Sequence, residues 1–179
     1  PNLGLFGSPL TTSLPASITE TSGAHNWPGI TDTRSVEQLA SPAGSVVRWT
    51  SSAESLTING GEVPGGKTII VNAPNSIIWI RGDITYHDGP YANLSELPQM
   101  IIIGRNVVVN HWNHLPASQH VTRVDAWLVG ENYVSTCNTV GDQSNWLNGA
   151  QLDGHCSKPL RVNGPIISDH LYLKRTFGA

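Results

Sequence analysis

The sequence predicts an all-β protein, namely a parallel β-solenoid (β-helix) of about five coils with an irregular N-terminal arm or cap. Three observations indicate this fold. Apolar residues alternate with mixed ones, glycines recur at similar intervals, and no long segment has a helical period. A β-sandwich is the alternative, because short strands separated by Gly, Pro and Asn turns also describe that class.

The repeat becomes visible when five glycines are aligned: Gly60, Gly82, Gly104, Gly130 and Gly164. Their spacings are 22, 22, 26 and 34 residues. The positions two and four residues before each glycine are all apolar: Ile58, Ile80, Ile102, Leu128, Val162, Leu56, Ile78, Met100, Ala126 and Leu160. The positions between them are mixed, which is typical of strands that line a core with alternate side chains. Each repeat is therefore expected to be one coil, with the glycine at a corner.

Two regions are predicted along the chain. Residues 1–45 are rich in Pro, Ser, Thr and Gly and lack the repeat, so we expect an N-terminal arm or cap over an otherwise open end coil. Within it, RSVEQLA (residues 34–40) is expected to be a short helix capped by Asp32 or Thr33, with Val36 and Leu39 on one face. Residues 46–179 are predicted to form the solenoid domain, interrupted by loops at 87–98 and 111–120 and an insertion at 137–159.

Composition narrows the partners and the location. The net charge is -3 with only three lysines, so the basic surface that nucleic-acid binding requires is missing. The longest apolar runs have four residues, so no membrane-spanning segment is expected. The charged fraction of 13% is about half of the usual ~25%, and Ser, Thr and Asn replace it, which indicates an extracellular or cell-surface protein. A start at Pro1 predicts a processed chain or a fragment.

The two cysteines, Cys137 and Cys156, flank the insertion at 137–159. In an extracellular protein they are expected to form a structural disulfide, which closes a loop of about 20 residues and contributes on the order of 3 kcal/mol. Two buried free thiols are the alternative. Redox catalysis is not expected, because the C-x-x-C spacing is missing.

Metal binding has only weak candidates. His111 and His114 lie in HWNH, with His87 and His120 in or beside neighbouring loops. Imidazoles are good ligands for zinc or copper, but HWNH is not a recognised ligand spacing and no carboxylate or thiolate lies beside it in the sequence. We therefore expect no metal and no other cofactor.

Catalytic candidates are the carboxylates Asp83, Asp125 and Glu131. Asp83 and Glu131 share a position relative to the aligned glycines, two coils or roughly 10 Å apart, a separation that inverting glycosidases use. Arg81, Arg105 and Arg123 are the candidate binders of an acidic sugar. Carboxylates beside strand corners are more often simply solvated, so we expect a protein without catalytic activity.

An outward apolar patch is the stronger signal: Trp79, Ile101, Ile103, Trp127 and Val129 occupy positions that should face water. A patch of this kind requires a cover or a partner. The cover is either the chain's own N-terminal arm or an arm or face of another subunit. The apolar residues of the arm are Leu3, Leu5, Phe6, Leu10 and Leu14.

Three strings of the sequence resemble a protein family: SELPQMIIIGRNVVVN, VTRVDAWLVGENYVSTC and CSKPLRVNGPIISDHLYLKRTFG. They are similar to uncharacterised exported proteins of candidate-phyla bacteria, among them Patescibacteria and Saccharibacteria, over roughly residues 66–178. The resemblance implies a cell-surface β-solenoid loosely similar to bactofilins, with the two cysteines paired across the insertion and no known catalytic residues. Residues before 45 resemble nothing in these proteins.

The sequence thus predicts a non-catalytic extracellular module with a structural or adhesive role, which assembles into oligomers or filaments or binds another cell-surface protein. The alternative is a carbohydrate-binding or carbohydrate-cleaving β-helix module. In that case Trp112, Trp127 or Trp146 would serve as stacking platforms for a glycan.

Overall fold

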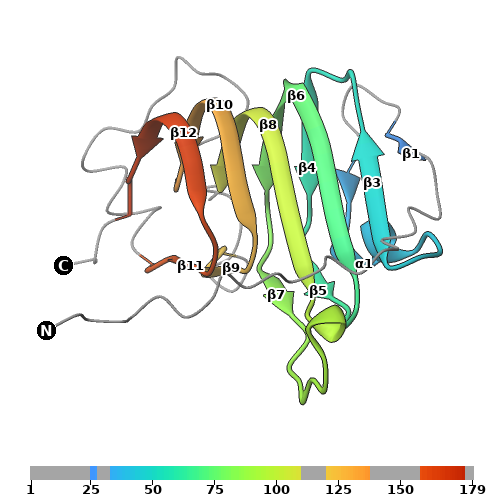
Figure 1. Ribbon diagram of the computed structural model, residues 1–179. Coiled ribbons are helices and arrows are strands. Elements are labelled where there is room, and N and C mark those ends of the chain that lie inside the picture. The colour runs from blue at the N-terminus through green and yellow to red at the C-terminus, as the bar shows by residue number, and fades with distance from the viewer. Residues whose placement is uncertain (1–24, 28–32, 110–119, 138–157, 176–179) are drawn as a thin grey trace, which may run out of the picture.

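The computed structural model describes residues 25–27, 33–109, 120–137 and 158–175 (Figure 1). Sheet A contains eight strands: β1 (His25–Asn26), β2 (Thr33–Arg34), β3 (Val46–Thr50), β4 (Ser55–Ile58), β6 (Thr68–Ile80), β8 (Gln99–Val109), β10 (Trp127–Ser135) and β12 (Ile166–Tyr172). Sheet B contains four: β5 (Gly61–Val63), β7 (Ile84–Tyr86), β9 (Arg123–Val124) and β11 (Arg161–Val162). A five-residue helix, α1 (Val36–Ala40), and a 3-10 turn, η1 (Leu94–Glu96), complete these elements.

The strand order follows the chain. Sheet A runs β1-β3-β6-β8-β10-β12, with β4 beside the second half of β6 and β2 beside β4, and sheet B runs β5-β7-β9-β11. From β4 onward the chain alternates between the two sheets. Every strand pair in the described residues is parallel. The predicted all-β parallel fold is confirmed at this level, and the β-sandwich alternative is wrong because sandwiches consist of antiparallel sheets.

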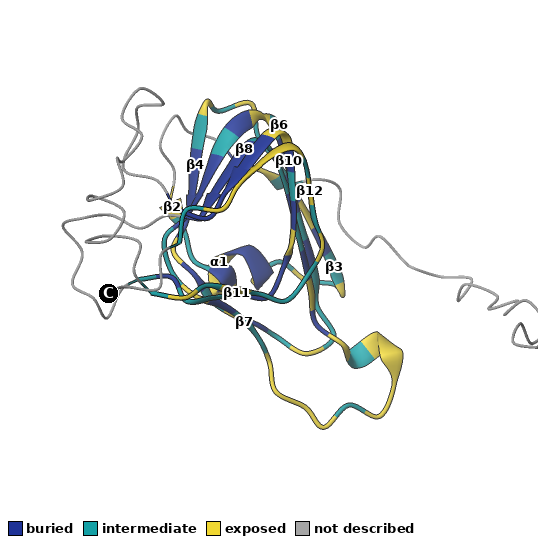
Figure 2. Ribbon diagram, turned by 90° about the vertical axis from the view of Figure 1, so that its left-hand side faces the viewer, coloured by how far each residue is buried: buried dark blue, intermediate teal, exposed yellow. Residues whose placement is uncertain are grey.

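The core lies between the sheets. β6 and β8 are long strands that shift register between residues 73 and 77 of β6, and each of their halves pairs separately. Seen end-on, the two halves of sheet A and sheet B enclose the buried interior on three sides (Figure 2). Alternate residues of the strands point inward and are fully buried, as in the stacked row Val71, Ile102 and Leu128. Apolar rows of this kind are the consequence of the period of two seen in the sequence.

The proposed alignment of the repeats is correct in two steps and wrong in two. Ile58 pairs with Ile80, and Ile102 pairs with Leu128, as expected. However, Ile80 lies opposite Val109, and Ile102 lies opposite Val71. Leu128 pairs with Ile166, not with Val162. These two steps differ because glycine does not mark the same position in every layer.

The glycines in fact occupy two kinds of position. Gly60 and Gly82 are stacked at a corner between the sheets, where Gly60 has a φ of +85° and lies against the backbone of Gly82 and Asp83. Gly104 and Gly130 lie within strands and pair with one another, and a side chain on Gly130 would meet the Tyr133 carbonyl. The expectation that all of these glycines sit at corners is therefore wrong.

Helix α1 closes one end of the core. Val36 and Leu39 were predicted to share one face of the helix, and both are fully buried. The cap is Ser35 rather than Asp32 or Thr33: the Ser35 side chain accepts from the Gln38 N–H, and the Gln38 side chain accepts from the Ser35 N–H. The Trp49 indole donates to the Leu39 carbonyl at 2.9 Å and ties the helix to β3. This capping box explains why so short a helix can form.

The described part of residues 1–45 belongs to the same core as the rest of the chain. β1 pairs with β3, β2 pairs with β4, and Trp27 is 1% exposed within the main cluster. The apolar residues of the predicted arm, Leu3, Leu5, Phe6, Leu10 and Leu14, lie outside the described residues.

Candidate functional site

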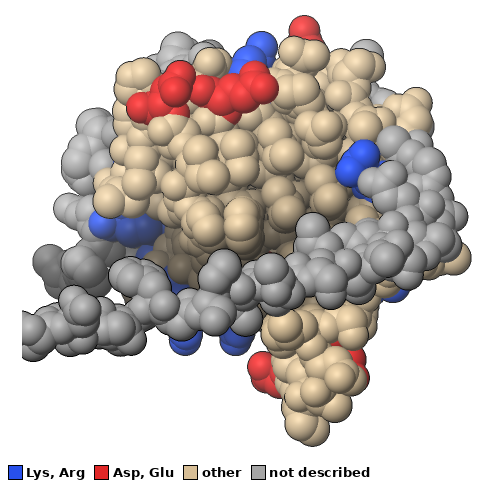
Figure 3. Space-filling view, in the orientation of Figure 1, with Lys and Arg blue, Asp and Glu red and all other residues tan. Residues whose placement is uncertain are grey.

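The outer side of sheet A carries an apolar face, which we define by six residues: Ile70, Ile101, Ile103, Trp127, Val129 and Ile167. They form two rows across the sheet, Ile70–Ile101–Trp127 and Ile103–Val129–Ile167. Trp127 is 43% and Ile167 54% exposed, and the other four are partly exposed. Figure 3 shows this side of the molecule, with no charged side chain in the middle of the sheet. Four of the five residues of the predicted patch therefore lie together.

The fifth, Trp79, lies elsewhere. It belongs to the second half of β6, where it pairs with Val108, and it is only 6% exposed. It forms a small cluster with Val108 and Tyr133, apart from the main core, and its indole donates to Ser55 Oγ at 3.0 Å. Trp79 is therefore not part of the apolar face.

The end of the fold formed by β11 and β12, together with Leu173, is exposed, and we call it the open end. Among the described residues, β12 pairs only with β10, and β11 pairs only with β9. Leu171 continues the inward row of Val134, which is fully buried, yet Leu171 is 46% exposed because no further strand of the described residues pairs beyond β12. Ile167, Tyr172 and Leu173 are exposed as well. Figure 2 is viewed from the open end, and α1 lies at the far end of the fold.

A pocket of about 360 Å³ lies where the loop after β7 approaches the start of β10. Its aromatic lining is Tyr86, Tyr91 and Trp127. Gln99 and Asn163 also line the pocket, as do the loop residues His87 and Asp88. Only Trp127 among these had been proposed as a glycan platform; Trp112 and Trp146 lie outside the described residues.

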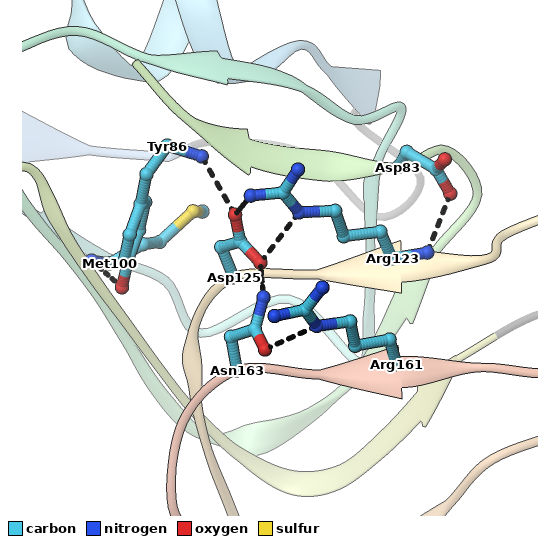
Figure 4. Close-up of polar contacts among 7 residues, drawn as sticks. All are labelled: Asp83, Tyr86, Met100, Arg123, Asp125, Arg161 and Asn163. Atoms are coloured by element: carbon cyan, nitrogen blue, oxygen red, sulfur yellow. Dashed lines mark hydrogen bonds and ion pairs between the residues drawn. The ribbon is translucent and has the colours of Figure 1, made fainter. Parts of the chain in front are cut away.

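Asp125 is the centre of a buried polar network beside this pocket (Figure 4). Its carboxylate is 1% exposed and accepts from both Nε and a terminal nitrogen of Arg123, at 3.0 and 2.6 Å. It also accepts from the Tyr86 N–H at 3.0 Å and from Asn163 Nδ2 at 2.6 Å. Arg161 in turn donates to Asn163 Oδ1. This network joins β7, β9 and β11 and is a structural clamp between the layers.

The sequence contained a signal for this clamp. Arg-Val-Asp at 123–125 and Arg-Val-Asn at 161–163 are a repeated tripeptide. Arg123 pairs with Arg161, and Val124 with Val162. The spacing of 38 residues is also the true interval between Leu128 and Ile166. The glycine alignment used 34 and therefore missed it.

We expect the clamp to make stability depend on pH. Burial raises the pKa of Asp125, but the hydrogen bonds from Arg123, the Tyr86 N–H and Asn163 outweigh it, and the pKa is lowered. A lowered pKa in the folded state contributes stability above the unfolded value of about 3.9, and this is lost as pH falls through the folded value. Urea unfolding between about pH 5 and 2 measures the loss. Asp125→Asn should show a flatter profile; parallel profiles would contradict this assignment.

Asp83 and Glu131 do not form the predicted pair of carboxylates. Asp83 accepts from the Thr122 N–H and hydroxyl at 2.6 and 2.9 Å, and from the Arg123 N–H at 3.0 Å. Glu131 lies in β10 and is exposed. The shared position was an artefact of the glycine alignment, because Gly130 lies opposite Gly104 and not above Gly82.

The candidate arginines come from three separate elements. Arg123, in sheet B, binds Asp125, whereas Arg105 lies within β8 of sheet A. Arg81 follows β6 at the corner, and burial lowers its pKa. None of the three is among the described residues that line the pocket.

The remaining candidates fall largely outside the described residues. His111, His114 and Cys156 are not described, whereas Cys137 is fully buried. His87 contacts Glu62 Oε1 at 2.8 Å in an exposed pair. Within the described ranges, no group of three or more potential metal ligands occurs. In the same part of the chain, no helix is long and apolar enough to span a membrane.

Comparison of the chain with family models, curated proteins and solved structures finds no match. The resemblance to exported proteins of candidate-phyla bacteria therefore stays an expectation, and the function has to be argued from the site itself.

Proposed function

We propose that the chain is a parallel β-solenoid that serves as a non-catalytic structural or adhesive module outside the cell and self-associates through its open end. The observation that carries this proposal is the asymmetry between the two ends of the fold. One end is closed by α1, with Val36 and Leu39 fully buried, whereas the other exposes Leu171 and its neighbours.

The solenoid interpretation is supported by the path of the chain. The chain alternates between sheet A and sheet B, and successive strands of each sheet are parallel neighbours. Each passage around the core then corresponds to one coil, with about five coils in the domain. The unequal intervals place the extra residues in loops such as 87–98, outside the stacked strands.

The non-catalytic interpretation is supported by the state of the carboxylates. Asp125 is fixed by four hydrogen bonds or ion contacts within the clamp, and Asp83 accepts three hydrogen bonds from the segment at Thr122 and Arg123. A general acid or base must be free to exchange a proton with substrate. These two groups are used to hold strands together.

The lengths of the edge strands indicate which end associates. At the α1 end, the edge strands β1 and β2 have two residues each, and short edge strands resist added pairing. At the open end, β12 has seven residues, and three of its large apolar side chains are exposed: Ile167, Leu171 and Tyr172. A long exposed apolar edge is a template for another strand.

The occupant that we propose is a second copy of this chain. Because the α1 end is closed, we expect two copies to meet open end to open end, which gives a two-fold dimer with antiparallel β12 strands. Filaments would require a second contact, which the arm at residues 1–20 is proposed to supply.

Light scattering coupled to size-exclusion chromatography tests this proposal. We expect twice the chain mass of 19.2 kDa at about 100 µM, and dissociation on dilution. Leu171→Lys places a charge in the interface and should give a monomer, because an edge lysine blocks added strands. The matched control is Leu94→Lys, on a residue that is 87% exposed in the loop after β7, and it should leave the dimer unchanged.

Two outcomes would overturn the open-end dimer: a wild-type monomer at all concentrations, or a Leu171→Lys variant that still dimerises. Deletion of residues 1–20 separates the two proposed contacts. The dimer should survive the deletion, whereas larger assemblies should disappear if the arm links them. Loss of the dimer itself would assign the contact to the arm and refute the open-end proposal.

A further inference from the structure

We propose that the pocket beside Trp127 is a binding site for an uncharged saccharide. The inference is independent of self-association, since the pocket lies at the junction of the loop after β7 with β10, whereas the proposed dimer contact is made by β12. It rests on the aromatic lining, on the anchoring of that lining, and on an unused hydroxyl group.

The aromatic lining provides a platform. Trp127 begins β10 at the margin of the apolar face and is 43% exposed, so its indole can be covered by a ligand without any rearrangement of the core. Tyr86 and Tyr91 line the same pocket. The C–H faces of a sugar ring pack against aromatic rings in the way that other apolar surfaces do, while its hydroxyl groups stay at the edge.

The polar lining is held in place before any ligand arrives. The Tyr86 N–H is bound by Asp125 and the Tyr86 hydroxyl accepts from the Met100 N–H at 3.2 Å. Asn163 is fixed between Asp125 and Arg161. The clamp thus positions the Tyr86 ring and the Asn163 amide in the pocket, and this lowers the entropy cost of binding a ligand.

The loop that closes the pocket is also anchored. Glu96 accepts from the Ala92 N–H at 2.8 Å and from the Asn93 amide at 2.9 Å, and its own carbonyl accepts from the Gly66 N–H at 2.7 Å. His87 contacts Glu62 at the start of the loop. The loop is therefore fastened both to itself and to β5 and the turn that follows.

One polar group in this loop is unused. The Tyr91 hydroxyl is buried and has no hydrogen-bond partner among the described residues. Burial raises the pKa of Tyr91, and the charges of Asp88 and Glu62 raise it further, so the hydroxyl stays protonated and can donate. Leaving such a group without a partner is costly, and a turn of the Tyr91 ring toward the pocket would let a ligand hydroxyl satisfy it.

The charges select the class of saccharide. Among the described residues, no lysine or arginine lines the pocket, whereas Asp88 does. Glu62 contacts His87, which also lines the pocket. An anionic sugar would meet like charge without a cation to balance it. At about 360 Å³ the pocket is at the small end of ligand sites, which suits one or two neutral sugar rings.

Titration calorimetry with a panel of neutral mono- and disaccharides tests the proposal, with a glycan array to choose the panel. We expect binding in the range of about 10 µM to 1 mM, and a change in tryptophan fluorescence on saturation. Trp127→Ala should weaken binding by about tenfold or more, because the stacking platform is removed. Tyr91→Phe removes only the hydroxyl and should weaken it about fivefold.

Two controls separate loss of the site from loss of the fold. Leu94→Ala lies in the same loop outside the pocket lining and should bind as the wild type does. Trp127→Phe retains a smaller ring and should recover part of the affinity, and all variants should keep the wild-type melting temperature. Three results would overturn the inference: no neutral saccharide binds, acidic glycans bind more tightly, or a folded Trp127→Ala variant binds as well as wild type.

Discussion

Replacement of Asp125 by alanine should lower the free energy of unfolding by about 3 kcal/mol, one of the largest effects expected of any single substitution in this protein. The carboxylate is 1% exposed and receives contacts from Arg123, Tyr86 and Asn163. Its removal leaves four donor nitrogens of these three residues without their acceptor. The Arg123 side chain is 39% exposed, so water recovers part of its charge, and the loss falls at the lower end of the range for a broken buried pair.

Urea unfolding at neutral pH measures this effect. Asp125→Asn keeps the shape and one acceptor oxygen, and should cost less than Asp125→Ala. Glu131→Ala is the matched control, because Glu131 is an exposed acid on a strand, and it should change stability by less than about 0.5 kcal/mol. Equal losses in Asp125→Ala and Glu131→Ala would show that the clamp does not stabilise the fold.

Replacement of Gly60 by alanine should also cost about 3 kcal/mol. Two independent terms add at this residue. The φ of +85° is disfavoured for any residue with a Cβ, and the new Cβ would meet the backbone of Gly82 and Asp83 on the neighbouring corner. Because those atoms are backbone atoms, the contact can be relieved only by moving one layer of the fold away from the next.

Gly65→Ala is the control for this prediction. Gly65 lies in the turn before β6, and its added Cβ would be at ordinary contact distance, 3.5 Å, from the nearest atom, the Glu96 carbonyl oxygen. The change should be neutral or slightly stabilising, since alanine restricts the unfolded chain. Thermal unfolding of both variants compares them. If the Gly60→Ala and Gly65→Ala variants have the same melting temperature, the stacked corner is not a point of close backbone contact.

The alternation of inward and outward residues along each strand could be predicted from the sequence better than the register between neighbouring strands. The inward rows were predictable, because Ile58, Ile80, Ile102 and Leu128 are all buried as the alternation requires. The register between layers was only half correct. Alternation states which side of a strand a residue occupies, whereas register depends on where each loop places its extra residues.

The candidate sites illustrate the same limit. Trp127 could be identified as an outward aromatic. Tyr86 and Tyr91 precede it by 41 and 36 residues and Asn163 follows it by 36, and no spacing rule predicts that they line one pocket with it. The sequence places Trp79 and Trp127 alike at outward positions. Trp79 is nevertheless buried, because in the second half of sheet A it packs against Val108 and Tyr133. Asp125 and Asn163 were visible as a repeat, but not as a clamp.

By itself the sequence determined that this chain forms parallel β-structure with a continuous apolar interior, because alternation and glycine-marked repeats are local properties of short segments. The tertiary structure decided which residues of different layers meet: the Asp125 clamp, the pocket beside Trp127, the closed α1 end and the open β12 edge. These features depend on loop lengths and on the bend within β6 and β8, which bring distant segments together through contacts that no single segment encodes.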